Sequence, residues 1–352
     1  MAALQGVTSD YGDVPTEVLN LEPTSLDFSD FSTNRLSSAD IKFFTENGYL
    51  IVPDVLDRSQ HSRLCELLAV LKEQKVQEGR HPEENLMQAC FTAANDLGTN
   101  LDIVGLLTQR KIFPKVVDIL GTNIYCYHAM ARLDSPAPPG TVIPSDFGAL
   151  PPFGYHQDSG LQNDFRNSRD GSYKVSPRIS LKVAYYLSDV SSPGSGNTWA
   201  VPGSHLTDNT LGVVQLGHKG GLGQPPGAIP ICCPANSCLI FDRRLWHGVS
   251  PNWSQKPRVS LFYGYAYRWF KARDPMFVEP SFETTNCPIA RQMLGFTTQN
   301  CGLFHGNGLD VPLKAWLDSH GCVDGLGYDR FVPSERDGRG RGHRPMSGKG
   351  SE

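Results

Sequence analysis

The chain has 352 residues, of which 39% are hydrophobic and 10% aromatic, a composition that supports a sizeable core in one large domain or two smaller ones. Its 32 basic and 36 acidic residues give a formal net charge of −4, and no basic stripe or polybasic block argues for nucleic acid or a membrane surface as a partner. We therefore expect a small-molecule substrate that is held by local contacts.

The first third of the chain is expected to be mainly helical. Residues 1–36 are polar, show no sustained helical period, and are predicted to form a flexible arm. Ser38 is a suitable N-cap for a short amphipathic helix, and the apolar run at residues 48–53 indicates a strand that proline closes. A second helix is predicted from four leucines spaced three and four positions apart, and a third over residues 103–120, with Gly121 as its C-cap. The leucines are Leu64, Leu67, Leu68 and Leu71.

From Ile124 onward, short β-rich runs alternate with Gly, Pro, Asn and Asp, which is typical of a sandwich or barrel rather than of βαβ units. The predicted strands cover residues 125–130, 179–187, 199–201, 237–241 and 259–267. Two Gly/Pro-rich loops are expected at residues 135–152 and 212–230, and loops of this length often carry function. Residues 334–352 are Arg/Gly-rich without apolar periodicity and are predicted to form a disordered tail, which leaves one domain over residues 37–333.

Cysteine usage and the chain ends favour a soluble cytoplasmic protein. Nine cysteines is an odd number, no CxxC pair occurs, and the adjacent Cys232 and Cys233 cannot easily chelate one metal together, so we expect reduced thiols. The N-terminus lacks the charged and apolar regions of a signal peptide, and no apolar run approaches the ~18 residues of a membrane span. The C-terminal sequence is not a peroxisomal address.

The sequence His156-Gln157-Asp158 is the first candidate for chemistry. In an extended strand, side chains two positions apart point to the same face, so His156 and Asp158 would project together while Gln157 points away. Imidazole and carboxylate suit a divalent metal ion, and a second histidine would complete the 2-His-1-carboxylate set used for Fe(II). The alternative is structural, because Asp158-Ser159-Gly160 would also make a good Asx-turn.

Two residues farther along the chain fit the same chemistry. His247 follows the apolar run at residues 238–241, and a histidine at the end of a buried strand can be held rigidly toward an interior pocket. Arg258 stands just before another β-run, and a buried arginine needs an anion because an unpaired buried charge is costly. That anion is either an Asp or Glu of the same chain or the distal carboxylate of 2-oxoglutarate, which a planar guanidinium binds bidentately.

Several motifs occur in an order that resembles a known family. They are Glu46-Asn47-Gly48-Tyr49-Leu50-Ile51-Val52-Pro53, His156-Gln157-Asp158, Pro202-Gly203-Ser204-His205, Trp246-His247-Gly248, and Arg258 eleven positions after His247. This order resembles the phytanoyl-CoA dioxygenase (PhyH) family of Fe(II)/2-oxoglutarate-dependent oxygenases, from roughly Ser38 to Phe331. The resemblance implies a mainly β fold, with a double-stranded β-helix (jelly-roll or cupin-like) core and flanking α-helices.

The resemblance also implies a role for each matching residue. His156, Asp158 and His247 would be the Fe(II) ligands at the catalytic centre, and Arg258 would anchor the C5 carboxylate of 2-oxoglutarate. Met130 and Gln157 align with weaker cosubstrate contacts in some members of the family.

Four further positions bear on the surroundings of the site. Ala184 stands where some members carry a tryptophan over the cosubstrate. Lys182 or Trp199 could fill that space, although each is otherwise interpreted as a strand residue on the outer face. His205 belongs to a turn that is structural in the family, so we expect it not to bind the metal.

These roles imply a dioxygenase that hydroxylates a C–H bond of a small metabolite with O2 and 2-oxoglutarate, releasing succinate and CO2, with ascorbate as a supporting reductant. A carboxylate at Asp158 disfavours halogenation, while desaturation, epoxidation and ring formation stay open. Two alternatives come from other classes. One is a non-catalytic binding protein on a degenerate oxygenase fold, and the other is a cupin-like metal hydrolase or isomerase, which needs no arginine anchor.

The sequence does not specify the substrate or the oligomeric state. Specificity is expected in the loop at residues 135–152 and in the arm at residues 1–36, because binding residues concentrate on loops carried by a rigid scaffold. Four cations could meet an anionic substrate, although solvated surface charge is the more ordinary interpretation of each. They are Arg132, Arg166, Arg169 and Lys182.

Overall fold

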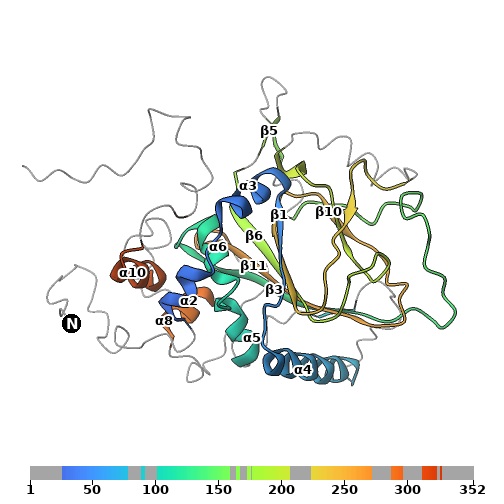
Figure 1. Cartoon of the computed structure of the whole chain (residues 1–352), viewed down its shortest axis with the longest axis horizontal. Coiled ribbons are helices and arrows are strands. Elements are labelled where there is room, and N and C mark those ends of the chain that lie inside the picture. Colours follow the sequence, from blue (N-terminus) through green and yellow to red (C-terminus); the bar gives the residue numbers. More distant parts are fainter. Residues whose placement is uncertain are drawn as a thin grey trace, which may run out of the picture.

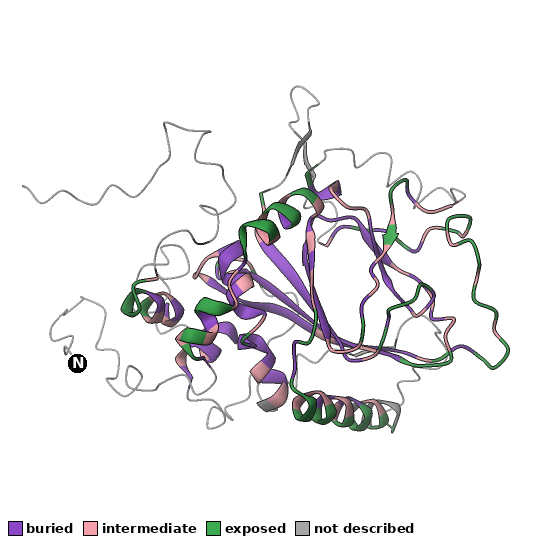
Figure 2. Cartoon of the chain, viewed as in Figure 1, coloured by how far each residue is buried: buried purple, intermediate pink, exposed green. Residues whose placement is uncertain are grey.

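Two antiparallel β-sheets make up the centre of the fold, and most helices gather toward one end of the larger sheet (Figure 1). The computed structural model describes residues 26–77, 89–91, 101–158, 164–166, 173–175, 177–206, 223–271, 287–295, 311–322 and 326. The tail expected at residues 334–352 and most of the arm expected at residues 1–36 lie outside them. Figure 2 shows that the long central strands are buried, whereas much of the surface of helix α4 (Arg58–Gln77) is exposed.

The larger sheet has six strands in the order β1-β9-β6-β11-β3-β2, and the smaller sheet has three in the order β10-β7-β8. The larger sheet contains β1 (Tyr49–Val52), β2 (Ala89–Phe91), β3 (Ile124–Asp134), β6 (Ser180–Tyr186), β9 (Ser237–Asp242) and β11 (Arg258–Tyr267). The smaller sheet contains β7 (Thr198–Ala200), β8 (Ile229–Pro230) and β10 (His247–Val249), and β4 (Asp164–Arg166) pairs with β5 (Tyr173–Val175). From β6 to β11 the chain passes repeatedly between the two sheets, so both sheets contribute to one apolar cluster.

The helices cover the face of the larger sheet that points away from the smaller one. Besides α4, they are α2 (Phe28–Thr33), α3 (Ser38–Asn47), α5 (Leu101–Gly105), α6 (Phe113–Leu120), α8 (Pro288–Met293), α10 (Pro312–Ser319) and the 3-10 helix η2 (Leu106–Thr108). A second 3-10 helix, η4 (Ser204–Leu206), follows β7 of the smaller sheet. None of the helices in the described ranges is long and apolar enough to cross a bilayer.

Strand β11 shows why the two faces of the larger sheet differ. On the helix side, Tyr263 and Tyr265 donate hydrogen bonds to the carbonyls of Ile103 (3.1 Å) and Leu107 (2.9 Å). Successive side chains of a strand point to opposite faces, so Arg258 and every second residue after it point toward the smaller sheet. The polar residues on that second face therefore lie in the space between the sheets.

Most of the predicted strands are confirmed, although β3 extends four residues farther, to Asp134. The antiparallel β core with flanking helices is also as expected. The short strands β2, β4, β5, β8 and β10 and the helices α8 and α10 were not predicted, because they contain too few residues to show a period. The seven cysteines whose side chains the structure describes are free thiols.

Three predictions near the N-terminus are corrected. The expected arm is not loose at its end, because α2 forms there with Asp27 as N-cap, and Phe31 is buried. The N-cap of α3 is Ser37 rather than Ser38, and it forms a capping box with Asp40. The helix expected over residues 103–120 is broken after η2, since Pro114 fits the first turn of a helix and not its interior.

His205 connects the η4 turn to the junction between α3 and β1. Its Nε2 donates to the carbonyl of Thr45 (3.1 Å), and burial lowers the pKa of the ring to about 4, so that it stays neutral. The ring lies on Gly48, which ends α3 with a φ of 79°. A Cβ at Gly48 would stand 2.5 Å from Nδ1 of His205. His205 is thus a packing residue, as expected, and lies outside the candidate metal cluster.

We expect Gly48→Ala to lower the free energy of unfolding by about 3 kcal/mol, because left-handed strain of ~1 kcal/mol adds to an overpacking cost of ~1–3 kcal/mol. Urea unfolding of the two proteins measures the difference. Gly140→Ala is the matched control, since Gly140 has a φ of 82° and a Cβ added there would meet no atom within 4 Å. Gly140→Ala should lower the free energy of unfolding by only ~1 kcal/mol. Equal losses at both glycines would contradict the contact with His205.

Candidate metal centre and adjoining cavity

The backbones of His156 and His247 are paired directly. His156 forms an antiparallel bridge with His247, the first residue of β10, and the two residues exchange N–H···O hydrogen bonds of 2.8 and 3.0 Å. Residues paired in this way carry their side chains on the same face of the ladder. The ring centroids are accordingly 4.4 Å apart. This corrects the expectation that His247 ends the preceding buried strand, because it begins a new strand in the other sheet.

Each of the two imidazoles is oriented by its own chain. Nδ1 of His156 donates to the carbonyl of Gly154 (3.0 Å), and Nδ1 of His247 donates to the carbonyl of Leu245 (2.8 Å). A proton on Nδ1 leaves Nε2 as the lone-pair donor, which is how metal-binding histidines are usually fixed. Burial and the neighbouring His156 lower the pKa of His247 to about 4, so its ring is neutral and able to bind a metal ion.

Asp158 completes the cluster on the same side of the chain as His156. The ligand atoms of His156, Asp158 and His247 all lie within 4.8 Å of one another. The N–H of Asp158 donates to the carbonyl of Arg243 (2.9 Å), and Nζ of Lys182 lies 3.9 Å from its Oδ2. Burial raises the pKa of Asp158, but Lys182 and the imidazoles outweigh burial and hold the pKa below its usual range. Two imidazoles and one carboxylate fit a divalent metal ion.

A buried cluster of charges shapes the turn that supports this site. Asp242 accepts hydrogen bonds from Nε (2.8 Å) and Nη2 (2.6 Å) of Arg244 and from Nε of Arg178 (2.8 Å). The turn that starts at Asp242 presents the Arg243 carbonyl to Asp158 and leads into His247. Asp242 thus fixes the backbone that positions two of the three candidate ligands.

Arg258, the first residue of β11, is buried between the two sheets. Its Nη1 donates to Oδ2 of Asp134 (2.9 Å), so the ion pair within the chain that the sequence left open does exist. Its Nη2 lies 3.5 Å from Oγ1 of Thr198, and its guanidinium packs over the ring of Tyr186. No acceptor among the described residues takes a hydrogen bond from Nε of Arg258, nor does the buried hydroxyl of Ser260 on the same face have a partner there. Donor capacity for one more anion therefore remains at Arg258.

The other residues that the sequence suggested for the site have different surroundings. Met130 lies on β3 opposite Phe262 and packs in the cluster between the sheets, as a cosubstrate contact requires. The side chain of Gln157 points away from the cluster and donates to the carbonyl of Arg244, so its amide is engaged in a structural bond. Lys182 lies buried on the inner face beside Asp158, which excludes the alternative that it is an outer-face strand residue. Trp199 packs in a separate aromatic cluster with Phe153.

Four contributors to the site were missed by sequence reasoning. They are Asp134, Thr198, Asp242 and Ser260. Ser260 could have been found, because a strand that starts at Arg258 carries its second following residue on the same face. The other three give no signal in the sequence, since each acts through a partner on another strand or turn. The side chains of Arg166 and Arg169 lie outside the described residues.

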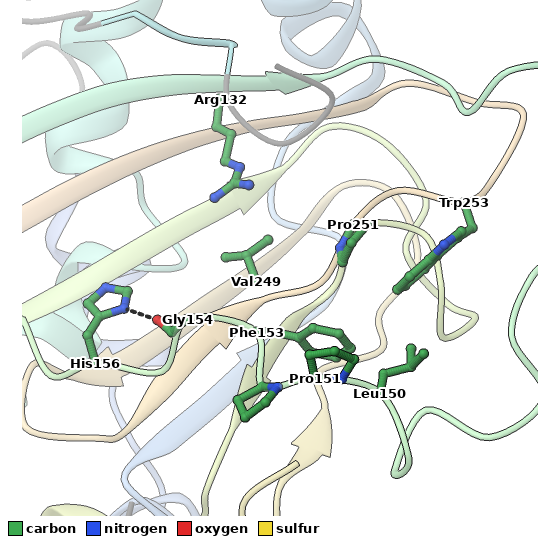
Figure 3. A pocket seen from close by; sticks show the side chains of 10 residues that line it. Arg132, Leu150, Pro151, Phe153, Gly154, His156, Val249, Pro251 and Trp253 are labelled. Carbon is green, nitrogen blue, oxygen red and sulfur yellow. Dashed lines mark hydrogen bonds between the residues drawn. The ribbon is translucent and has the colours of Figure 1, made fainter. Parts of the chain in front are cut away.

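A cavity of about 350 Å³ adjoins His156 (Figure 3). Leu150, Pro151 and Pro152 of the proline-rich loop line it together with Phe153, and Val249, Pro251 and Trp253 line it from the segment after His247. Arg132 of β3 extends its guanidinium toward it (Figure 3). The end of the loop expected at residues 135–152 therefore borders a cavity beside the candidate metal centre.

The chain is similar to known proteins in its sequence and in its structure. Residues 44–260 match the sequence profile of the phytanoyl-CoA dioxygenase (PhyH) family. The uncharacterized protein Rv1501 of Mycobacterium tuberculosis is 26% identical over 226 residues, which covers 64% of this chain and 73% of that protein. Among solved structures, HygX from Streptomyces hygroscopicus with nickel and 2-oxoglutarate bound is similar at a TM-score of 0.49 and 14% identity, covering 68% of this chain and 90% of that chain. The non-heme alpha ketoglutarate dependent carbocyclase SnoK from nogalamycin biosynthesis gives a TM-score of 0.44 at 18% identity, with 66% and 84% covered.

We expect Asp242→Asn to lower the free energy of unfolding at pH 7 by about 3–5 kcal/mol, because it leaves the buried Arg244 and the half-buried Arg178 without their anion. The paired arginines hold the pKa of Asp242 below its usual range, so its contribution is complete above the unfolded pKa of ~3.9 and is lost as the pH falls below that value. His205 is the other titratable group that faces Asp242. Urea unfolding between pH 3 and pH 7 should show the two proteins converging at the acid end.

The same variant should bind Co(II) or Ni(II) about tenfold more weakly, because the turn that positions Asp158 and His247 loses its support. Asp118→Asn is the matched control, since Asp118 is equally buried and paired with Arg35 (2.7 Å) in the helical layer. It should lower stability without changing metal affinity. A loss of metal affinity that is equal in both variants would contradict a positioning role for Asp242.

Proposed function

The chain belongs to the phytanoyl-CoA dioxygenase family, and on this premise we propose that it is an Fe(II)- and 2-oxoglutarate-dependent oxygenase that hydroxylates a C–H bond of a small organic molecule. The observation that carries the proposal is the convergence of His156, Asp158 and His247 within 4.8 Å, between the two sheets. Family membership gives the class of chemistry, and this cluster gives the chain the residues to perform it.

We infer that the two sheets form a double-stranded β-helix. Along the chain from β6 to β11, strands β6, β9 and β11 lie in the larger sheet and β7, β8 and β10 in the smaller one, so the chain crosses repeatedly between two facing sheets, as in a jelly roll. The candidate ligands come from the smaller sheet and from the segment that pairs with it, while Arg258 comes from the larger sheet. Metal and cosubstrate would therefore both bind in the space that the two sheets enclose.

The ligand set favours iron with open coordination positions. Two histidines and one carboxylate on one side of a metal form the facial triad of non-haem Fe(II) oxygenases, which leaves the opposite positions for cosubstrate and O2. Asp158 supplies the carboxylate and Lys182 stabilises its charged form, whereas halogenation requires a small residue in place of that ligand. These features support hydroxylation.

Arg258 is the proposed anchor for the distal carboxylate of 2-oxoglutarate. Asp134 occupies only Nη1, and burial makes the remaining donor capacity of the guanidinium costly to leave unused. Thr198 and Ser260 place hydroxyl groups in the space between the two sheets, where both can donate hydrogen bonds to the same carboxylate. Met130 is proposed to contact the chain of the cosubstrate from β3.

When bound, Fe(II) supplies the oxidation: 2-oxoglutarate, O2 and the substrate C–H become succinate, CO2 and the C–OH group, with one oxygen atom in each of succinate and alcohol. The protein orients the reactants and excludes water. His156 and His247 keep their Nδ1 protons on backbone carbonyls, so that only Nε2 faces the metal. Lys182 keeps Asp158 ionised.

We expect the purified protein with Fe(II) and 2-oxoglutarate, without O2, to develop a visible absorption band, and with O2 to form succinate slowly even without substrate. His247→Ala and Asp158→Asn should abolish both signals, because each removes a metal ligand. His320→Ala and Asp146→Asn are the matched controls, since both residues lie exposed outside the cluster. Absence of both signals in the unaltered protein would exclude the oxygenase and favour a binding protein.

We expect Arg258→Met to weaken 2-oxoglutarate binding by about ten- to hundredfold, the value of a lost hydrogen-bonded charge contact, while Fe(II) affinity stays unchanged. Titration of the absorption band with 2-oxoglutarate measures the effect. Arg35→Met is the control, since Arg35 also pairs with a buried aspartate but lies in the helical layer. Unchanged 2-oxoglutarate affinity in Arg258→Met would favour a metal hydrolase or isomerase.

A further inference from the structure

The walls of the cavity beside His156 are of two kinds. At one end stand His156 and the guanidinium of Arg132, and at the other end the rings of Phe153 and Trp253 stand beside Pro151 (Figure 3). Among the described residues that line the cavity, Arg132 is the sole one with a permanent charge. A volume of about 350 Å³ is at the small end for ligand pockets.

Arg132 is held in place before any ligand binds. Its Nε lies 3.0 Å from both carboxylate oxygens of Asp134, and Asp134 is fixed in turn by Arg258. Arg132 and Arg258 therefore share one carboxylate, with Arg132 the member that lines the cavity. A guanidinium that is already oriented binds a carboxylate with little further loss of freedom.

The apolar end of the cavity is also rigid. Phe147 packs against Trp253 with 5.7 Å between ring centroids, and Phe153 packs against Trp199 at 5.3 Å. The backbone N–H of Trp253 donates to the carbonyl of Gly194 (2.8 Å), and this hydrogen bond fixes the backbone that carries the ring. These packed rings and the neighbouring prolines offer a ligand apolar surface and few hydrogen-bonding groups.

We propose that the cavity takes a small carboxylic acid with an apolar, ring-containing body, with its carboxylate on Arg132 and its ring on Phe153 and Trp253. This inference rests on the proposed function, for which it names the substrate class. The described wall carries a single permanent charge, which is too few to neutralise a polyphosphate. The rest of the wall is largely apolar and offers too few hydrogen-bonding partners for the hydroxyl groups of a sugar. His156 borders the same cavity, so a bound acid would lie beside the metal centre.

The test compares each acid with its own primary amide, which has nearly the same shape and no charge. The probes are 3-phenylpropionate and 4-phenylbutyrate with their amides, and butyrate as an acid without a ring. Calorimetry measures binding to the protein as purified, and again after loading with Ni(II) and 2-oxoglutarate, where no turnover occurs. The first measurement tests the cavity even if the oxygenase proposal fails, because it needs neither metal nor cosubstrate.

We expect at least one phenyl acid to bind more than tenfold more tightly than its amide, since the carboxylate gains a charged hydrogen bond. Arg132→Met should reduce the acid-to-amide ratio to less than threefold, while Arg63→Met, a control in an exposed pair with Asp102, should leave it unchanged. Trp253→Ala should weaken the binding of the phenyl acids by about three- to tenfold relative to that of butyrate. It should leave the ratio of acid to amide affinity unchanged.

Three results would overturn the proposal. The first is that no acid in the panel binds, or that acids and amides bind equally to the unaltered protein, a comparison that depends on no variant. The second is an acid-to-amide ratio that survives Arg132→Met. The third is a variant Arg132→Met that loses 2-oxoglutarate binding and keeps the ratio, because Arg132 would then belong to the cosubstrate site.

Discussion

The two backbone hydrogen bonds between His156 and His247 are the constraint on which the site depends. They join the segment after the proline-rich loop to the first residue of β10, so both imidazoles point to the same side. A shift of this pairing by one residue would turn one ring to the opposite face. Asp158 then reaches the cluster because it stands two positions after His156 on an extended backbone. The three ligands are thus positioned by backbone register and not by flexible side chains.

Buried charge is the second constraint, and the fold meets it with arginine–aspartate clusters. Arg258 and Arg132 share Asp134 between the two sheets, and Arg178 and Arg244 share Asp242 behind the metal-site turn. A buried ion pair seldom adds stability over apolar packing, so its presence is better explained by a need for orientation. The first cluster orients guanidinium groups toward the space between the sheets, and the second fixes the turn that presents the ligands.

Most strands and the candidate metal ligands were predictable, because both follow from local rules. The alternation of side chains along a strand was enough to pair His156 with Asp158, and the long strands β6, β9 and β11 are mainly apolar and almost wholly buried. The prediction of one unbroken helix over residues 103–120 was wrong for an equally local reason, since Pro114 favours the first turn of a new helix. The sequence left the face of Lys182 open, because that face depends on the register of β6 with β11 and β9.

The sequence by itself determined the chemical identity of the candidate centre: two imidazoles, a carboxylate and an arginine at defined positions in the chain. Only the tertiary structure decided what surrounds them. Asp134 lies 124 positions before Arg258, and their contact exists because β3 and β11 are neighbours in antiparallel register. The cavity with Arg132 at one end and Trp253 at the other likewise joins distant segments. Pairing between strands is set by the packing of the whole core, and no local pattern in the sequence encodes it.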